Sequence, residues 1–289
     1  NHEVQAALTN HYDEKMEVLE TLEAQKRFLR QHHSPLDQND PESAALRLLV
    51  GAHRLHDFAV GKIRGDRRDR DAKYQLVDGR DIEAWKAAIR PETSVFFLES
   101  PTNPVLELVD IQAVADLAHE NNGCLIVDNV FATPLQQKPL ELGADVVVYS
   151  ATKHIDGQGR CLGGVVLGSE EWVDEKLHDY YRHTGPALSP FNAWNLLKGL
   201  ETLPVRVERQ TRTAGVIAEF LHQHSNITRL MYPGHSSHPQ AELAARQMRG
   251  GSTLVAFEVQ GGKDAAFRFE NSLRTISISN NLGDAKSLV

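Results

Sequence analysis

In the stretch VVVYSATKHIDGQGR (residues 146–160), an apolar run ends at two hydroxyl residues, Ser150 and Thr152. Lys153 follows immediately after them. A lysine in this place can pair with a carboxylate, extend its amine to water, or serve as a nucleophilic amine with a pKa below the ordinary value of about 10.4. A second apolar run ends in Asp128, which alone is more typical of a cap or a loop ligand. Together, the amine, the carboxylate and the hydroxyls favour a catalytic site.

The elements that must position these groups are three apolar runs, SVFFLE (94–99), CLIVD (124–128) and DVVVYS (145–150). The runs are continuous rather than alternating, which is typical of strands covered on both faces in a parallel α/β sheet. A helix capped by Asp81 is predicted before the first run, and helices are predicted between the runs, one capped by Asp110 and a short one in PLQQKPLELG. Ligands of such sheets bind beyond the carboxyl ends of the strands, where 99–103, 128–129 and 150–153 are expected to converge.

The remaining chain divides into further helices and a second, smaller α/β pattern. A strand is predicted in GGVVLG, helices after Ser169 and Ser189, and a long helix in PVRVERQTRTAGVIAEFLHQH. Beyond it, a helix is predicted in HPQAELAARQM and strands in STLVAFEV and RTISIS. We therefore predict three parts: an irregular or helical segment at 1–74, with a surface helix near 13–31, a large domain at 75–205 and a small C-terminal domain at 206–289.

One cofactor, pyridoxal 5'-phosphate (PLP), needs the groups found at these strand ends. It requires an amine to form an imine with its aldehyde, a carboxylate to keep its pyridine nitrogen protonated, and donors for its phosphate. Lys153 can supply the amine and Asp128 the carboxylate, and Ser150 and Thr152 could donate to phosphate oxygens. This spacing is compatible with a PLP site but is not diagnostic alone.

Four blocks of sequence carry a more specific resemblance: FFLESPTNPVLELVDI, LIVDNVFATP, GADVVVYSATKHIDGQGRCLGGVVLG and GPALSPFNAWNLLKGLETLPVR. In composition, order and separation they resemble the Cys/Met-metabolism family of PLP enzymes, from about residue 75 to 289. This implies fold type I, with a mostly parallel sheet, helices on both faces and a smaller C-terminal α/β domain. KHIDGQGR and ISISNNLGDAKSL are similar to the O-succinylhomoserine sulfhydrylase branch of the family.

The resemblance implies a role for each matching residue. Lys153 would form the imine and act as general base, and Asp128 would pair with the pyridine nitrogen. Ser150 and Thr152 would bind phosphate. Asn103 would contact the cofactor's phenolic oxygen or the substrate, and Asn281 and Leu282 would line the site near the substrate carboxylate.

The activity implied is γ-replacement in methionine biosynthesis, in which O-succinylhomoserine and sulfide give homocysteine and succinate. Cystathionine γ-synthase or methionine γ-lyase activity is the alternative within the family. A cofactor-free binding or scaffold protein is the alternative of another class.

Residues 1–74 depart from the family pattern. The family's phosphate-binding Ser-Gly-Met turn does not occur before residue 75, and residues 1–50 contain no glycine. The family's substrate-clamping arginine is expected beyond the last motif but is not matched before Val289. A chain that omits residues, an altered early reading frame and a degenerate relative would each explain this, and the retained Lys153 and Asp128 favour the first two.

Composition limits the partners. The net charge of -8 disfavours a nucleic-acid binder, which needs a basic surface. Two cysteines without a CxxC spacing, Cys124 and Cys161, suggest a reducing cytoplasm, and no apolar run has transmembrane length. A soluble cytoplasmic enzyme acting on a small amino acid, without a metal, is expected, and the resemblance implies a homotetramer.

Two competing sites are disfavoured by sequence context. The glycines of GQGRCLGG precede a strand instead of opening a helix, so a dinucleotide site is not indicated. His235 and His238 lack a nearby carboxylate or thiolate on the same element, which favours a surface loop over a metal site. His154 is expected to be a hydrogen-bonded structural residue.

Overall fold

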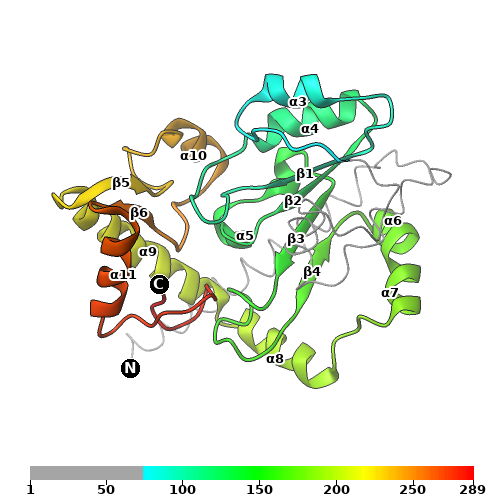
Figure 1. The fold of residues 1–289 in the computed structure, drawn as a ribbon. Helices are drawn as coiled ribbons and strands as arrows, with labels where there is room; N and C mark the ends of the chain where they lie inside the picture. The colour runs from blue at the N-terminus through cyan, green and yellow to red at the C-terminus, as the bar shows by residue number, and fades with distance from the viewer. Residues whose placement is uncertain (1–73) are drawn as a thin grey trace, which may run out of the picture.

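The computed structural model describes residues 74–289, which form two β-sheets surrounded by helices (Figure 1). The helix predicted near residues 13–31 lies outside the described residues. Within 74–289, every helix is too short or too polar to cross a membrane.

The larger sheet has four strands in the order β1 (Val95–Glu99), β2 (Cys124–Asp128), β3 (Val146–Ser150) and β4 (Gly164–Leu167). The first three are parallel, and β4 runs antiparallel to β3. The predicted strands and the mostly parallel sheet are therefore confirmed. Because β1 to β3 run in one direction, their last residues lie along the same edge of the sheet.

One face of this sheet is covered by α4 (Ile111–Glu120), with α3 (Ile82–Ala88) beside it (Figure 1). Both helices begin at the predicted caps, since Asp81 and Asp110 accept hydrogen bonds from backbone N–H groups of their first turns. The buried stripe of α4, which includes Val114 and Ala118, packs in one core with Leu125 and Val127 of the sheet.

The opposite face of the sheet packs on Trp172, which is 4% exposed and contacts a cluster containing Ile126 and Val148. This tryptophan ends α6 (Glu170–Trp172), which Ser169 caps as predicted. A π-helical stretch, Val173–His178, and α7 (Asp179–Thr184) follow. The sheet is therefore covered on both faces, which explains its continuous apolar strands.

Shorter helices connect these layers. α5 (Thr133–Gln136) and a 3-10 helix (Pro139–Leu142) lie between β2 and β3. α8 (Pro190–Leu200) begins at the predicted Ser189 cap, whose hydroxyl accepts the Asn192 N–H.

The smaller unit consists of β5 (Ile227–Met231) and β6 (Ala256–Val259), paired antiparallel, with α10 (Ala241–Gln247) and α11 (Gly262–Ser272). The long helix α9 (Leu203–His222) runs beneath this sheet (Figure 1). Its residues Ala214, Ala218 and Leu221 form a core with Leu230 and Tyr232.

In this region one sequence prediction is wrong, and two elements were not predicted. The strand predicted in RTISIS is wrong, because the segment makes only an isolated bridge, between Ser277 and Leu288 near the end of the chain. Alternating β-branched residues favour a strand, but a strand also needs a partner in a sheet. β5 and α11 were not predicted, since neither has a strongly periodic apolar pattern.

Candidate active site

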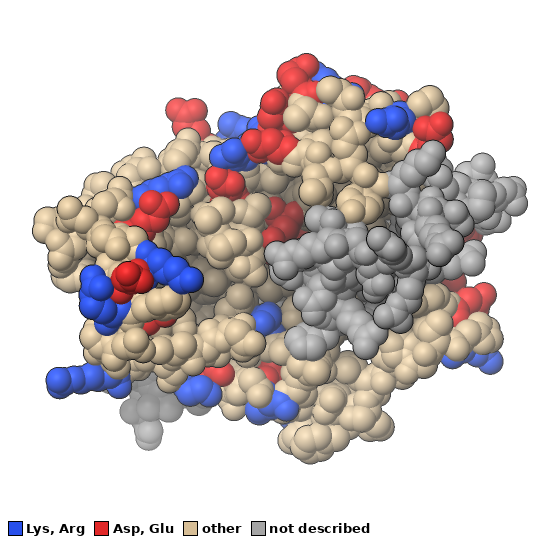
Figure 2. Space-filling model, in the orientation of Figure 1, with Lys and Arg blue, Asp and Glu red and all other residues tan. Residues whose placement is uncertain are grey.

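The carboxyl ends of β1, β2 and β3 form the floor of the candidate site. Glu99 and Asp128 are direct neighbours in the parallel register, and Asp128 faces Val148 on β3. Side chains alternate along a strand, so Ser150 points to the same face as these carboxylates, about 7 Å further along β3. Figure 2 shows acidic side chains beside a hollow between the parts of the molecule that carry the two sheets.

The two carboxylates have different surroundings. Glu99 Oε2 accepts the backbone N–H of Asn103 at 3.0 Å, and Asp128 Oδ1 accepts that of Val130 at 3.0 Å. Burial, reinforced by the negative charge of Asp128, raises the pKa of Glu99 to about 8. A proton held on Glu99 at neutral pH removes the repulsion between the neighbouring carboxyl groups.

Lys153 lies three residues beyond the end of β3 and is half-buried. Its Nζ donates a hydrogen bond to Oδ1 of Asn281 at 2.7 Å, so two predicted site residues from distant parts of the chain meet. Burial lowers the pKa of the Lys153 amine. A larger fraction of neutral amine is what a nucleophile or a general base requires.

The turn that carries Lys153 is held by an ion pair between the buried Asp156 and the solvent-exposed Arg160. Asp156 binds Arg160 in its own turn, with Oδ1 2.8 Å from Nε. Arg206 of α9 donates to the backbone carbonyls of His154, at 2.7 Å, and Gly199, at 2.8 Å. These contacts fix the backbone on which the lysine stands.

His154 has the structural role expected from the sequence. Its ring is buried, and Nε2 lies 2.7 Å from Oγ1 of Thr253. Burial, together with the charges of Arg206 and Lys153, lowers the pKa of His154 to about 3. The ring is therefore neutral at physiological pH.

Gly283 explains how the segment around Asn281 approaches the lysine so closely. It has a φ of +72°, and a Cβ placed on it would lie 2.6 Å from the backbone nitrogen of His154. Only glycine combines this left-handed conformation with such a close contact. Leu282 beside it is partly buried against the main core.

The remaining predicted residues differ in their surroundings. The Thr152 hydroxyl accepts the N–H of Gly163 at 3.1 Å, so it already supports the neighbouring strand connection. The Ser150 hydroxyl makes no hydrogen bond to another residue of the described part of the chain. Asn103 is exposed at the tip of the loop after β1.

Several residues of this region were not predicted. Glu99 was placed at the strand ends without a role, and Arg206 and Thr253 were not recognised. The four-residue spacing of Asp156 and Arg160 is the one local signal that could have indicated the charge pair.

The interpretation of His235 and His238 as surface residues is wrong for His238, which is 3% exposed. Its Nε2 donates to the carbonyl of Leu106 at 3.1 Å, and its Nδ1 accepts the Gln240 N–H. Within residues 74–289, no group of three His, Cys, Asp or Glu side chains is arranged to hold a metal.

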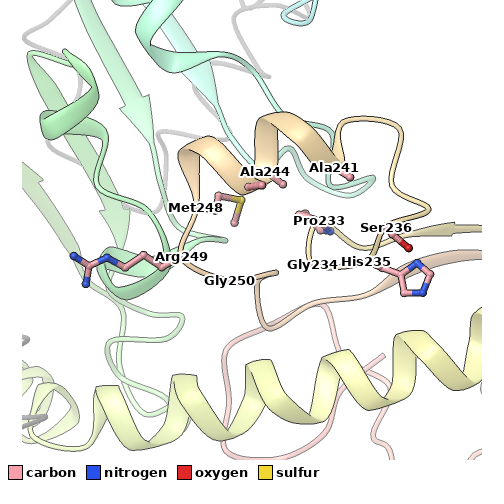
Figure 3. A pocket seen from close by; sticks show the side chains of 10 residues that line it. Pro233, Gly234, His235, Ser236, Ala241, Ala244, Met248, Arg249 and Gly250 are labelled. Carbon is pink, nitrogen blue, oxygen red and sulfur yellow. The ribbon is translucent and has the colours of Figure 1, made fainter.

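A cavity of about 310 Å³ lies away from these strand ends, between α10 and the loop after β5 (Figure 3). Pro233, Gly234, Ala244 and Met248 are among its lining residues. None of the predicted site residues lines it, so the convergence of titratable groups at the strand ends is the stronger indication of the active site.

Comparison with known proteins shows which family the chain resembles. Residues 67–289 match the family described as Cys/Met metabolism PLP-dependent enzyme. An O-succinylhomoserine sulfhydrylase of Mycobacterium tuberculosis is 53% identical over 218 residues, 74% of this chain and 54% of the relative. An L-methionine gamma-lyase of Porphyromonas gingivalis is 44% identical over 216 residues, 74% of this chain and 54% of the relative.

Among solved structures, metB from Corynebacterium glutamicum superimposes with a TM-score of 0.75 at 38% identity, covering 82% of this chain and 60% of that chain. The architecture is that of a fold type I PLP-dependent enzyme. The chain belongs to the Cys/Met metabolism PLP-dependent enzyme family. It spans about half the length of the curated relatives.

The residues present fit PLP by the chemistry of their donor groups. Lys153 offers an amine whose pKa is lowered by burial, and Asp128 a carboxylate on the neighbouring strand. Ser150 adds a hydroxyl on the same face of the sheet. The sequence predicted these three roles, and they stay predictions for individual residues.

Proposed function

We propose that this chain carries the cofactor-binding side of an enzyme for γ-replacement on O-acylhomoserines. The proposed reaction converts O-succinylhomoserine and sulfide to homocysteine and succinate. It is supported by the half-buried amine of Lys153 at the strand edge that also bears Asp128, and by the 53% identity to a sulfhydrylase. That observation of amine and carboxylate at one edge carries the proposal.

In this proposal each group has a defined task. When bound, PLP supplies an electron sink for negative charge at the substrate's Cα. Lys153 would hold the cofactor's aldehyde, and its neutral amine would serve as the base for proton transfer at the substrate's Cα and Cβ. Asp128 keeps the pyridine nitrogen protonated, and Ser150 and Thr152 donate to the phosphate. Asn281, which now accepts from Lys153, and Leu282 line the substrate side.

The test is covalent capture of the cofactor. Borohydride reduction of the PLP-loaded protein, followed by peptide mass spectrometry, is expected to find the cofactor's mass on the peptide containing Lys153. Lys153→Ala should lose both this adduct and turnover, whereas Lys198→Ala on the exposed side of α8 should keep both. An adduct on another lysine, or turnover by Lys153→Ala, contradicts the assignment.

The choice of substrate is a separate question. Methionine γ-lyase and cystathionine γ-synthase activity are the alternatives, and the lower identity of 44% to a methionine gamma-lyase favours the sulfhydrylase. Parallel assays with sulfide or cysteine as nucleophile, each with O-succinylhomoserine, and with methionine alone distinguish the three. A protein that stays colourless with added PLP and binds none would be the scaffold relative.

We also propose that the chain works as a homotetramer in the cytoplasm, with its large and small domains divided near residue 205. Exposed aromatic side chains on α8, Phe191 at 71% and Trp194 at 54%, support subunit contacts. The two cysteines, both free, agree with a reducing compartment. Light scattering on the purified protein tests the oligomeric state.

A further inference from the structure

The loop that follows β1 has an unusual source of hydrogen bonds. Residues 100–110 connect β1 to Ile111, the first residue of α4, and Leu106, Leu108 and Val109 in this loop are at most 3% exposed. Buried backbone groups need hydrogen-bond partners, and this segment belongs to no strand that could supply them.

Side chains of the smaller unit supply these partners. His238 Nε2 donates to the Leu106 carbonyl at 3.1 Å. Gln240 binds both backbone groups of Leu108, accepting its N–H at 2.8 Å and donating to its carbonyl at 2.6 Å. The segment that leads into α10 therefore replaces a neighbouring strand.

Gln247, at the end of α10, makes the most extensive of these contacts. Its Oε1 accepts the N–H of Ile111 at 3.1 Å, and its Nε2 donates to the Val109 carbonyl at 3.0 Å. Nε2 also lies 3.0 Å from Oε1 of Gln137 and 3.3 Å from the hydroxyl of Ser100. The side chain of Gln247 is 8% exposed, so water cannot easily replace these bonds.

Gln137 continues the network to the strand ends. Its Nε2 donates to the Ser100 carbonyl at 2.7 Å and to Oδ1 of Asn129 at 2.8 Å. Asn129 directly follows Asp128, the end of β2. The network therefore joins α10 to both carboxylate-bearing strands.

The position of the loop tip around Asn103 depends on these contacts to the buried part of the loop. The N–H of Thr102 bonds to the Glu107 carbonyl, and that of Leu106 to the Thr102 carbonyl, both at 2.8 Å, so the two arms of the loop are joined around Asn103. The tip itself is fixed to the strand end by one bond, from the Asn103 N–H to Glu99. A shift of the buried residues 106–109 would therefore move Asn103 relative to the strand ends.

We propose that Gln247 is a positioning residue, which holds the loop at 100–110 so that Asn103 faces the reacting molecule. The inference rests on the proposed function, in which Asn103 contacts the cofactor or the substrate. It makes α10 of the smaller unit a part of the active-site framework, although none of its residues is among those proposed to contact the cofactor or the substrate.

The test compares Gln247→Met with Gln112→Met in the full chain. Methionine keeps the length of glutamine but makes none of its hydrogen bonds, and Gln112 is an exposed position of α4. In Gln247→Met, hydrogen exchange of the Leu108, Val109 and Ile111 amides should rise on the order of tenfold or more. The ratio kcat/KM should fall on the order of a hundredfold, as for a misplacement of about 1 Å. Gln112→Met should change neither.

A double variant separates positioning from general destabilisation. If Gln247 acts through Asn103, Gln247→Met combined with Asn103→Ala should be no slower than Asn103→Ala alone. Leu221→Ala, a buried control in the core of the smaller unit, should multiply its effect with that of Asn103→Ala. If the losses of kcat/KM caused by Gln247→Met and Asn103→Ala multiply in the double variant, the inference is overturned.

The exchange measurement also distinguishes the two proposals. It needs no cofactor, so a protein that binds no PLP refutes the proposed function alone. Unchanged exchange at residues 106–111 overturns the positioning role, whatever the activity. If Gln247→Met fails to fold, Gln240→Met, which removes the paired contacts to Leu108, is measured by the same criteria.

Discussion

A proton on Glu99 makes a measurable contribution to the pH dependence of stability. Burial and the charge of Asp128 raise the pKa of this carboxyl from 4.5 to about 8. Between these pH values the folded protein keeps the proton and the unfolded chain has lost it, so the free energy of unfolding must fall as pH rises. The fall is about 1.4 kcal/mol per pH unit within the window, or about 5 kcal/mol in total at most.

Glu99→Gln removes this titration while retaining an oxygen that can accept the N–H of Asn103. The variant should gain stability relative to the wild type as pH rises from about 5 to 8, and the gap should stay constant above pH 8. Urea unfolding of the cofactor-free protein, followed by tryptophan fluorescence at several pH values, measures this gap. Glu92→Gln, in an exposed turn, is the matched control. Parallel stability curves for the wild type and Glu99→Gln would refute a proton held on Glu99 at neutral pH.

Two further substitutions test the support of the lysine. Arg206→Met should lower the free energy of unfolding by about 3 kcal/mol, because buried carbonyls lose their donors. Arg212→Met breaks only an exposed ion pair, so it should lower the free energy of unfolding by under about 1 kcal/mol. Urea titration measures both. Gly283→Ala should push its segment away from the His154 backbone. Hydrogen exchange should then become faster at Ala285, whose N–H donates to the carbonyl of Gly157 in the turn that carries Lys153. Gly262→Ala, at a similar left-handed φ but with no neighbour within 4 Å, controls for backbone strain, so equal effects on Ala285 exchange would contradict a contact-specific role.

The elements around the site could be predicted because their signals are local. Asp81 and Asp110 cap helices in the structure as the sequence indicated, and the three continuous apolar runs are strands of one sheet. Their common direction follows from the helices between them. This was sufficient to place Asp128 and Ser150 at one edge of the sheet.

What could not be predicted depends on contacts between distant segments. His238 is buried because its ring binds a carbonyl 132 residues earlier in the chain, which no local pattern indicates. The raised pKa of Glu99 requires the register that places Asp128 beside it. RTISIS has the composition of a strand but no sheet to join, so propensity alone gave the wrong assignment.

The helix α9 links parts of the molecule that the sequence suggested were separate. Its first turns hold the carbonyls behind the lysine through Arg206, and its later turns form the floor of the β5–β6 sheet. A cut at residue 205 would therefore remove an anchor of the turn that carries Lys153 along with the smaller sheet. The large and small parts differ in architecture, but the turn that carries Lys153 is held by a helix that also forms the core of the smaller unit. We therefore expect that neither part would keep its structure if it were moved alone into another protein.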